Sequence, residues 1–240
     1  MFKLNYPYKI YEFEELSSTN DTAKKLILEE KQNLIVAAKR QTGGKGRKGR
    51  SFNSPDGGLY ISFGLKLNLD INDLVKITTY AAVCVLNAIE TLSGANCEIK
   101  WVNDIRINGR KVCGILAENI YSVKTKENYT VLGIGVNVLG TEFPDSLKDI
   151  ATSIEKETGK KILISDLASE IANNLKDYDF SDYMDEYRAK SCVISKTVTV
   201  ISPNGSYEAK AVGITDDGKL KVEHSGKSEI LFSGDVSIKI

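Results

Sequence analysis

Apolar residues recur along the chain at two spacings, and each spacing predicts a different kind of element. Over residues 71–92 they fall three and four positions apart, which predicts a long core helix that begins at Ile71 or Asn72 and ends before Gly94. The residues at 65–69 predict a strand that continues the run before them. Shorter apolar runs are typical of buried strands and lie at 34–38, 59–63, 112–117 and 131–138.

Helix-start signals precede three further helical patterns. Ser17-Ser18-Thr19-Asn20-Asp21 offers capping hydroxyl and amide groups followed by an acid, so we predict a helix that continues to about Glu30. Ser165 and Ser181 each stand at the start of a shorter helical pattern. The alternating residues at 8–13 predict a short strand before the first helix.

The pattern changes near residue 190. Beyond it, short strands alternate with turn residues such as Pro203-Asn204-Gly205 and Asp216-Asp217-Gly218. Closely spaced hairpins of this kind predict a small β-barrel. We therefore predict an α+β chain with two domains, a larger one over residues 1–190 and a small barrel over 191–240.

Composition excludes several classes of protein. Charged residues make up 27% of the chain and hydrophobic ones 42%, and the N-terminal residues lack the apolar core of a signal peptide. The chain has one histidine, His224, and four cysteines without paired spacing, which argues against a zinc site and a histidine-based triad. We expect a reduced, cytoplasmic protein outside membranes, whose chemistry depends on lysine, arginine, backbone donors and bound ligands.

A loop between the strands at 34–38 and 59–63 concentrates positive charge. The whole chain balances 32 basic against 32 acidic residues, so this concentration is local. Glycines allow the backbone to turn its N–H groups toward an anion, and cations beside them would hold a phosphate or a carboxylate. The loop contains no acid and six cations: Lys39, Arg40, Lys45, Arg47, Lys48 and Arg50.

Four interpretations of this loop are open at this point. Gly44–Gly49 spells G-x-G-x-x-G, and Gly44–Ser51 differs from a P-loop by one residue. Both motifs need a helix directly after the glycines, whereas here Ser54-Pro55-Asp56-Gly57-Gly58 and a strand follow. The remaining interpretations are a nucleic-acid-binding loop and a mobile surface loop.

A second block of interest surrounds Lys111. Asn108-Gly109 lies between two apolar runs and predicts a hairpin, which places Lys111 at the start of the second strand. There it is either solvated or held at the edge of a pocket. Gly114 in the same strand, and Gly133 and Gly135 in the next, indicate close approach by a ligand or by another element.

Five motifs occur in an order and at a spacing that resemble biotin–protein ligases. Together with the terminal barrel they extend the resemblance over nearly the whole chain. The motifs are Ser18-Thr19-Asn20, the segment from Gln41 to Arg50, Ser54-Pro55-Asp56-Gly57-Gly58-Leu59-Tyr60, Lys100-Trp101-Val102-Asn103-Asp104 and Lys111-Val112-Cys113-Gly114-Ile115-Leu116.

The resemblance implies a mixed β-sheet catalytic domain packed with helices, related to lipoate–protein ligases, followed by an SH3-like barrel. It implies ATP-dependent ligation of biotin to a lysine of a biotin carrier domain through biotinyl-5'-AMP, with release of pyrophosphate and AMP. Mg²⁺ would accompany ATP, although the metal ligands are not predicted. The carrier would belong to acetyl-CoA carboxylase or another biotin-dependent carboxylase, and a homodimer is compatible with this family.

The same resemblance assigns roles to individual residues. Lys111 corresponds to the active-site lysine, and Arg47 and Arg50 are the other catalytic cations. Ser18 and Thr19 correspond to hydroxyl groups of the biotin pocket, while the Gly133–Asn137 strand corresponds to its floor. The full set of expected ligand-binding positions is Ser18, Thr19, Asn20, Gln41, Gly44, Lys45, Gly46, Arg47, Phe52, Lys111, Gly114, Gly133 and Asn137.

Three positions depart from the usual family pattern. Lys45 stands where the family has arginine, so a bidentate phosphate contact is lost there. Phe52 replaces tryptophan and can stack but has no N–H, and Val102 replaces proline. Residues 1–16 are too few for the helix-turn-helix domain of repressor-type members, so we expect a monofunctional ligase that binds no nucleic acid.

Two alternatives to biotin ligation belong to other classes. A lipoate– or octanoate–protein ligase would use the same lysine beside a longer apolar tunnel, but the basic, glycine-rich loop argues against it. A nucleic-acid-binding module would grip phosphates with that loop. The balanced charge and the lack of a second basic cluster argue against this second alternative.

Overall fold

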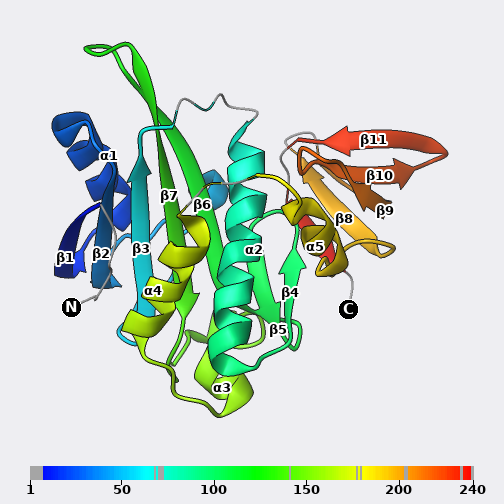
Figure 1. Cartoon of the computed structure of the whole chain (residues 1–240). Coiled ribbons are helices and arrows are strands. Elements are labelled where there is room, and N and C mark those ends of the chain that lie inside the picture. Colours follow the sequence, from blue (N-terminus) through cyan, green and yellow to red (C-terminus); the bar gives the residue numbers. More distant parts are fainter. Residues whose placement is uncertain are drawn as a thin grey trace.

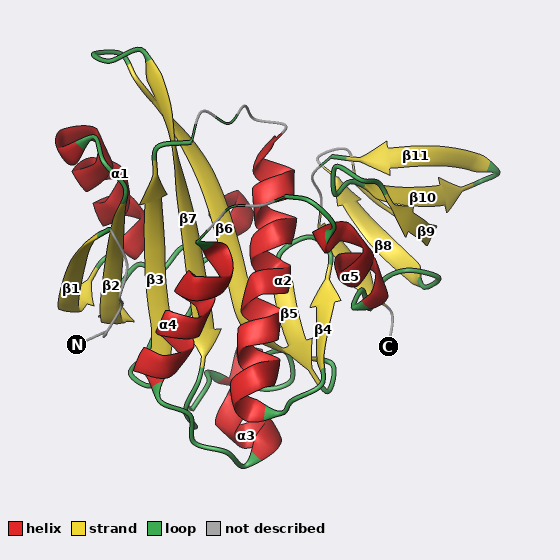
Figure 2. Cartoon of the chain, viewed as in Figure 1, coloured by secondary structure: helices red, strands yellow, loops and turns green. Residues whose placement is uncertain are grey.

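The computed structural model describes residues 8–67, 69, 73–140, 142–176, 178, 180–202, 205–232 and 235–238. Within these ranges the chain forms a large sheet with helices on both faces and a smaller sheet at its C-terminal end (Figures 1 and 2). The α+β class that the pattern of apolar residues predicts is therefore what the chain adopts.

The larger sheet is mixed and has seven strands in the order β1-β2-β3-β7-β6-β5-β4. The edge strand β1 runs parallel to β2, and every other neighbouring pair is antiparallel. The strands are β1 (Lys9–Leu16), β2 (Leu34–Gln41), β3 (Gly58–Leu65), β4 (Cys97–Lys100), β5 (Asp104–Ile107), β6 (Arg110–Ser122) and β7 (Glu127–Asn137).

The two faces of this sheet are covered unequally. Alternation along β3 sends Ile61 and Phe63 to the face that packs under α2 (Asp73–Ser93) and α4 (Ile164–Leu175). The other face carries α1 (Thr19–Glu30), which packs over β2 and β7 through a smaller apolar cluster. Figure 1 shows α2 and α4 in front of the sheet. On this face α1 contacts β2, β3 and β7 and does not extend over β5 and β4.

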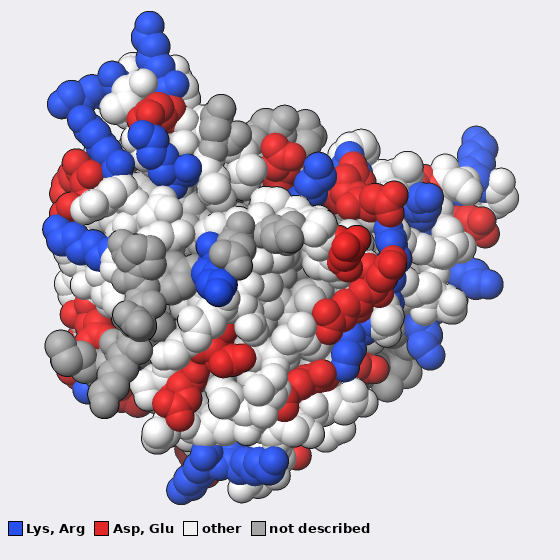
Figure 3. All heavy atoms as spheres, in the orientation of Figure 1, with Lys and Arg blue, Asp and Glu red and all other residues white. Residues whose placement is uncertain are grey.

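Two short helices complete the large domain, α3 (Ile154–Thr158) and α5 (Tyr183–Ala189). The face shown in Figure 3 carries both acidic and basic side chains, in keeping with the balanced net charge. By length and composition α2 could cross a bilayer, but 67% of its apolar window is buried inside the protein. It is the core helix that the spacing of its apolar residues predicts.

Most predicted elements are confirmed, with two exceptions. The predicted hairpin at Asn108-Gly109 joins β5 to β6, and both residues have positive φ, as this tight turn requires. The predicted strand at 65–69 is wrong, because β3 ends at Leu65 and the next N–H, of Lys66, bonds the side chain of Asn33 instead of a strand. The predicted helix start at Ile71 or Asn72 lies outside the described residues.

The C-terminal sheet has five antiparallel strands in the order β11-β10-β9-β8-β12. In the part of the chain that is described, β11 and β12 stand at the two ends of this order. Their apolar residues belong to the same core as α2. The boundary between residues 190 and 191 stays a prediction. The strands are β8 (Thr197–Ser202), β9 (Gly205–Ile214), β10 (Leu220–His224), β11 (Lys227–Leu231) and β12 (Asp235–Ile238).

Candidate active site

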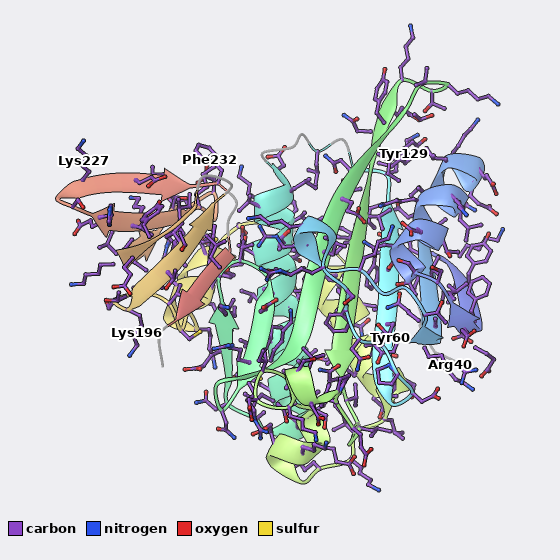
Figure 4. The ribbon with its side chains drawn as sticks, turned by 180° about the vertical axis from the view of Figure 1, so that it is seen from behind. Arg40, Tyr60, Tyr129, Lys196, Lys227 and Phe232 are labelled. Atoms are coloured by element: carbon purple, nitrogen blue, oxygen red, sulfur yellow. The ribbon has the colours of Figure 1, made fainter. Side chains whose placement is uncertain are left out.

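A polar cavity of about 120 Å³ opens on the α1 face of the large sheet. Figure 4 views the molecule from this side, where η1 (Arg47–Gly49), a single 3₁₀ turn of the basic loop, lies across β6 and β7. The cavity is lined by Ser18, Thr19, Asn20, Gln41, Lys45, Gly46, Arg47, Arg50, Ser51, Phe52, Asn103, Asp104, Lys111, Gly114, Ile115, Leu116, Gly133, Ile134 and Gly135.

The start of α1 forms one wall of the cavity. Ser18 is the N-cap and accepts a hydrogen bond from the N–H of Asp21. Thr19 donates both its backbone N–H and its hydroxyl to Oε1 of Gln41, at 2.8 and 3.1 Å. Gln41 in turn donates to the hydroxyl of Ser54 at 2.9 Å. A chain of hydrogen bonds therefore fixes the helix start against the end of β2.

Ser62, which the sequence analysis did not single out, lies beneath this wall. Its side chain is completely buried, and its hydroxyl lies 2.8 Å from Oγ1 of Thr19 and 2.6 Å from Oδ1 of Asn20. Asn20 also donates to Glu118 on β6 at 2.9 Å. A Cβ on Gly133 would lie 2.0 Å from Oδ1 of Asn20, so glycine is required there. Only the alternation along β3 could have indicated Ser62.

Lys111 reaches the opposite wall because β6 bulges. Ile105 pairs with Cys113 and Arg106 with Lys111, so Val112 is an extra residue that keeps Lys111 on the same face as Gly114. Nζ of Lys111 lies 2.6 Å from Oδ1 of Asp104. It also lies 5.7 Å from the centre of the Phe52 ring. The lysine thus sits between a carboxylate and an aromatic face, partly open to the cavity.

The basic loop is tied to both walls. Arg47 donates to Oδ1 of Asn103 at 3.3 Å, and Asn103 donates to the carbonyl of Ile115 on β6 at 2.8 Å. On the other side, Nζ of Lys45 lies 2.6 Å from Asp21 of α1. Partial burial, the largest single influence, opposes ionisation of Asp21, but the hydrogen bonds and charges of Lys45 and Lys24 together outweigh it and lower the pKa of that carboxyl. Lys45, despite replacing arginine, therefore fastens the loop to the helix.

Two of the expected site residues do not line the cavity. Gly44 closes the base of the loop, where its carbonyl accepts from the N–H of Phe52 and a Cβ would meet the Phe52 carbonyl at 2.4 Å. Asn137 is buried and donates to the carbonyl of Thr152, whose own N–H bonds the carbonyl of Lys111. Both residues stand behind the site as supports, and their expected contact with a ligand stays a prediction.

The other expected residues meet at the cavity, although their roles stay predictions. Ser18, Thr19, Asn20, Gln41 and Gly133 form the end near α1. The sequence analysis named Asn103 and Asp104 as parts of a motif without assigning a role to either. Nothing in the sequence singled out Glu118. The end near the basic loop is formed by Lys45, Gly46, Arg47, Arg50, Phe52, Lys111 and Gly114.

No group of three or more His, Cys, Asp or Glu residues that could hold a metal ion occurs among the described residues. Asp104, the carboxylate that lines the cavity, is paired with Lys111. Mg²⁺ typically binds proteins through one or two carboxylates and completes its shell with phosphates and water. The residues present therefore fit a metal that arrives with a polyphosphate and do not fit a closed metal cage.

Two family models match the chain. Residues 12–137 match the biotin/lipoate A/B protein ligase family, and residues 193–239 match the biotin protein ligase C-terminal domain. The chain belongs to the biotin–protein ligase family. The predicted family and fold class are thus confirmed, and the sheet of β8 to β12 corresponds to the SH3-like domain.

Relatives of this ligase agree along most of its length. The bifunctional ligase/repressor BirA of Bacillus subtilis is 34% identical over 237 residues, which cover 93% of this chain and 72% of the relative. The biotin–[acetyl-CoA-carboxylase] ligase of Paracoccus denitrificans is 27% identical over 91% of this chain and 96% of its own.

A solved structure extends the agreement to three dimensions. The biotin protein ligase from Aquifex aeolicus in complex with biotin and ATP matches with a TM-score of 0.80 and 27% identity. The match covers 96% of this chain and 98% of that one. The mixed sheet and the C-terminal sheet of this ligase therefore share one arrangement with an enzyme that binds both ligands.

Proposed function

We propose that this chain activates biotin with ATP to form biotinyl-5'-AMP and pyrophosphate, and then transfers biotin to a lysine of a carrier domain with release of AMP. The observation that carries the proposal is the meeting of Lys111 and the basic loop at one end of a cavity whose other end is lined by neutral polar groups. The neutral end suits the uncharged rings of biotin, and the basic end suits its carboxylate and the phosphates.

The first step brings together two anions that repel each other. A carboxylate must approach the α-phosphate of ATP, and cations beside both lower the energy of the charge that develops on phosphorus. Lys111 is held at this position by Asp104 and by its bulged strand, and Arg47 lies on the loop above. Much of the rate then comes from holding the two reactants in line.

The intermediate must afterwards be kept from water until the carrier lysine arrives. The basic loop is connected to α1 through Lys45 and to β6 through Arg47 and Asn103. A loop held at both sides covers the cavity and can release when the carrier binds. Phe52, which lies over Gly135 and Gly114, supplies the apolar part of this cover.

We infer that Mg²⁺ is held by the phosphates of ATP together with at most one or two carboxylates, where it would neutralise charge on the leaving pyrophosphate. The carrier would be the biotin domain of a carboxylase in the cytoplasm. The metal inference is supported by Asp104, the carboxylate that lines the cavity, and the carrier inference by the family match.

The direct test is the mass of a biotin carrier domain after incubation with this protein, biotin, ATP and Mg²⁺. We expect a gain equal to one biotin less one water, on a single lysine, that requires all three small molecules. Replacing biotin by lipoate is the matched control and should give no gain. A carrier that gains lipoate and not biotin would contradict the proposal.

A further inference from the structure

Beside the Asp104–Lys111 pair lie two cations to which the proposed mechanism assigns no role, although Lys100 belongs to one of the five family motifs. Lys100 ends β4 and pairs directly with Asp104, and Arg106 on β5 pairs directly with Lys111. Residues opposite each other in antiparallel strands lie on the same face, about 5 Å apart at Cβ. Ile99 and Ile105, which alternate with them, point into the core. A row of three cations therefore crosses the α1 face of β4, β5 and β6.

These two side chains lack partners. In the described ranges, neither Lys100 nor Arg106 has a side-chain hydrogen bond or ion pair, and Nε of Arg106 is buried with no acceptor. Glu98 lies opposite Arg106 in the register and is exposed, without forming an ion pair with it. Most other cations near the site are paired, as Lys45 is with Asp21 and Lys111 is with Asp104.

Burial makes this arrangement unfavourable for the empty protein. Loss of solvent lowers the pKa of Lys100; Asp104 opposes that change, while the like charges of Arg106 and Lys111 reinforce it. A half-buried ammonium and a buried guanidinium nitrogen without an acceptor both reduce stability. Such a row becomes favourable when an anion with several charges lies along it.

The geometry of adenylyl transfer indicates which anion would bind along this row of cations. In phosphoryl and adenylyl transfer the attacking and leaving oxygens lie on opposite sides of phosphorus. The neutral end of the cavity, at the start of α1, the end of β2 and β7, lies on one side of β6, whereas Lys100 and Arg106 lie on the other side, on β4 and β5. If biotin enters from the α1 side of Lys111, the leaving group departs toward β5 and β4.

We propose that Lys100 and Arg106 form the subsite for the β- and γ-phosphates of ATP, and so for the departing pyrophosphate. This proposal rests on the proposed function. In the step concerned, a carboxylate oxygen of biotin forms a bond to the α-phosphorus. The bond from that phosphorus to the α,β-bridging oxygen breaks, and its electron pair leaves on pyrophosphate. Lys100 and Arg106 bind the leaving group, and Lys111 binds the phosphate that stays.

The test compares variants in the two halves of the reaction. Lys100→Met and Arg106→Met keep the length of the side chain and remove its charge. The assay is biotin-dependent exchange of pyrophosphate into ATP, in which each substitution should raise KM for pyrophosphate about tenfold. The double variant should raise it further. The reason is that hydrogen bonds to charged groups contribute about 1.5–3 kcal/mol each. The affinity for biotin, and transfer to the carrier from pre-formed biotinyl-AMP, should be unchanged.

Three controls separate this role from a structural one. Lys100→Arg and Arg106→Lys keep the charge and should restore KM for pyrophosphate to within a few-fold. Lys196→Met removes an exposed charge just before β8 of the C-terminal sheet (Figure 4) and should change nothing. The Met variants should melt at the wild-type temperature or above it, because an unpaired, partly buried cation is removed. A purely structural role predicts a lower melting temperature instead.

Measurements on the wild-type chain avoid any effect of substitution on folding. Reductive ¹³C-methylation of lysines, with the Lys100 signal assigned from Lys100→Arg, should show the pKa of Lys100 rising when pyrophosphate binds. An unchanged KM for pyrophosphate in the double variant, or no response of the Lys100 signal at saturating pyrophosphate, would overturn the subsite.

The failures of the two proposals are distinguishable. Impaired transfer from pre-formed biotinyl-AMP with normal exchange would assign the two cations to docking of an acidic carrier surface and overturn the pyrophosphate subsite. Wild-type protein without any biotin-dependent exchange would overturn the proposed function itself, and the subsite with it. Active wild-type protein with unaffected variants would overturn the subsite alone.

Discussion

Lys111 is held through its ammonium group, its backbone and its contact with Gly114. These contacts explain how a flexible side chain can place its positive charge at a defined position. Its ammonium group bonds Asp104, and its backbone N–H and carbonyl bond Ile150 and Thr152. Its side chain lies over Gly114, where a Cβ would come within 3.0 Å of Nζ. A cation held in this way needs little reorganisation when charge develops on phosphorus.

Lys111→Ala should therefore abolish adenylate formation. Losing one preorganised donor of this kind costs about 3 kcal/mol or more, which is at least about a hundredfold in rate. Biotin-dependent pyrophosphate exchange measures the loss, and Lys196→Ala at an exposed position is the control. Normal exchange in Lys111→Ala would show that this lysine has no part in activation.

Ser62 makes a second prediction at the scale of one residue. Ser62→Ala removes the hydroxyl that contacts Thr19 and Asn20, so each of these side chains at the cavity loses one of its hydrogen bonds. Buried hydrogen bonds contribute about 1 kcal/mol each, so biotin affinity should fall roughly tenfold. Ser93→Ala, at another buried serine that bonds only within and just after α2, should lower stability without changing biotin affinity. Equal affinities for wild type and Ser62→Ala would contradict this role.

The importance of a site residue was predictable where a sequence motif contained that residue. It was not predictable where the role of the residue depends only on how the elements pack together. Lys111 and the glycines at 114 and 133 stand out in sequence because a cation after a hairpin and glycines inside strands are unusual. Ser62 and Glu118 do not, because one serine or glutamate in a strand is ordinary. Their importance comes from Asn20, which approaches them only after β3, β6 and α1 have packed together.

At the scale of elements, the basic loop is organised by its two anchors and has little regular structure of its own. η1 has only three residues and is followed by a strand, so the G-x-G-x-x-G pattern does not place a helix start at a phosphate. The sequence predicted this because the residues after it are Ser54-Pro55-Asp56-Gly57-Gly58. It could not predict the partners, since Asp21 and Asn103 are distant along the chain.

Arg47→Gly should loosen this loop over the intermediate. It removes the bond to Asn103 and adds backbone freedom, while the α1 end of the cavity keeps its contacts. We expect faster release of biotinyl-AMP, measured as its dissociation rate, with biotin affinity in the absence of ATP nearly unchanged. An unaltered dissociation rate would mean that the loop does not retain the intermediate through Arg47.

At the scale of the whole molecule, the C-terminal sheet is joined to the large domain through the neighbourhood of the active site. Nε1 of Trp101 donates to the carbonyl of Gly218 at 2.9 Å, and Trp101 stands two residues before Asn103. Arg188 of α5 donates to the carbonyl of Ile214 at 2.9 Å. One apolar core contains residues of both sheets.

We therefore expect one cooperative unfolding transition for the whole chain. A chain that stops at residue 190 would expose the apolar surface of Trp101 and α2, so its melting temperature should fall by many degrees. Calorimetric melting of the full and shortened chains gives both results. Two separate transitions in the full chain, or an unchanged melting temperature in the short one, would show two independent domains.

The overall architecture was largely predictable, because the apolar spacing marks the long helix, the buried strands and the C-terminal hairpins. The order of the strands was not, since β7 inserts between β3 and β6 and no local pattern records that pairing. The resemblance of five ordered motifs implied a mixed sheet but no strand order.

The central claim is that the cavity binds biotin and reacts it with ATP. Titration calorimetry of the wild-type chain with biotin and, separately, with lipoate, each with and without Mg-ATP, tests it most directly. We predict one-to-one binding of biotin without ATP, an added heat of reaction with ATP, and no binding of lipoate in either case. Saturable binding of lipoate together with no response to biotin would contradict the account.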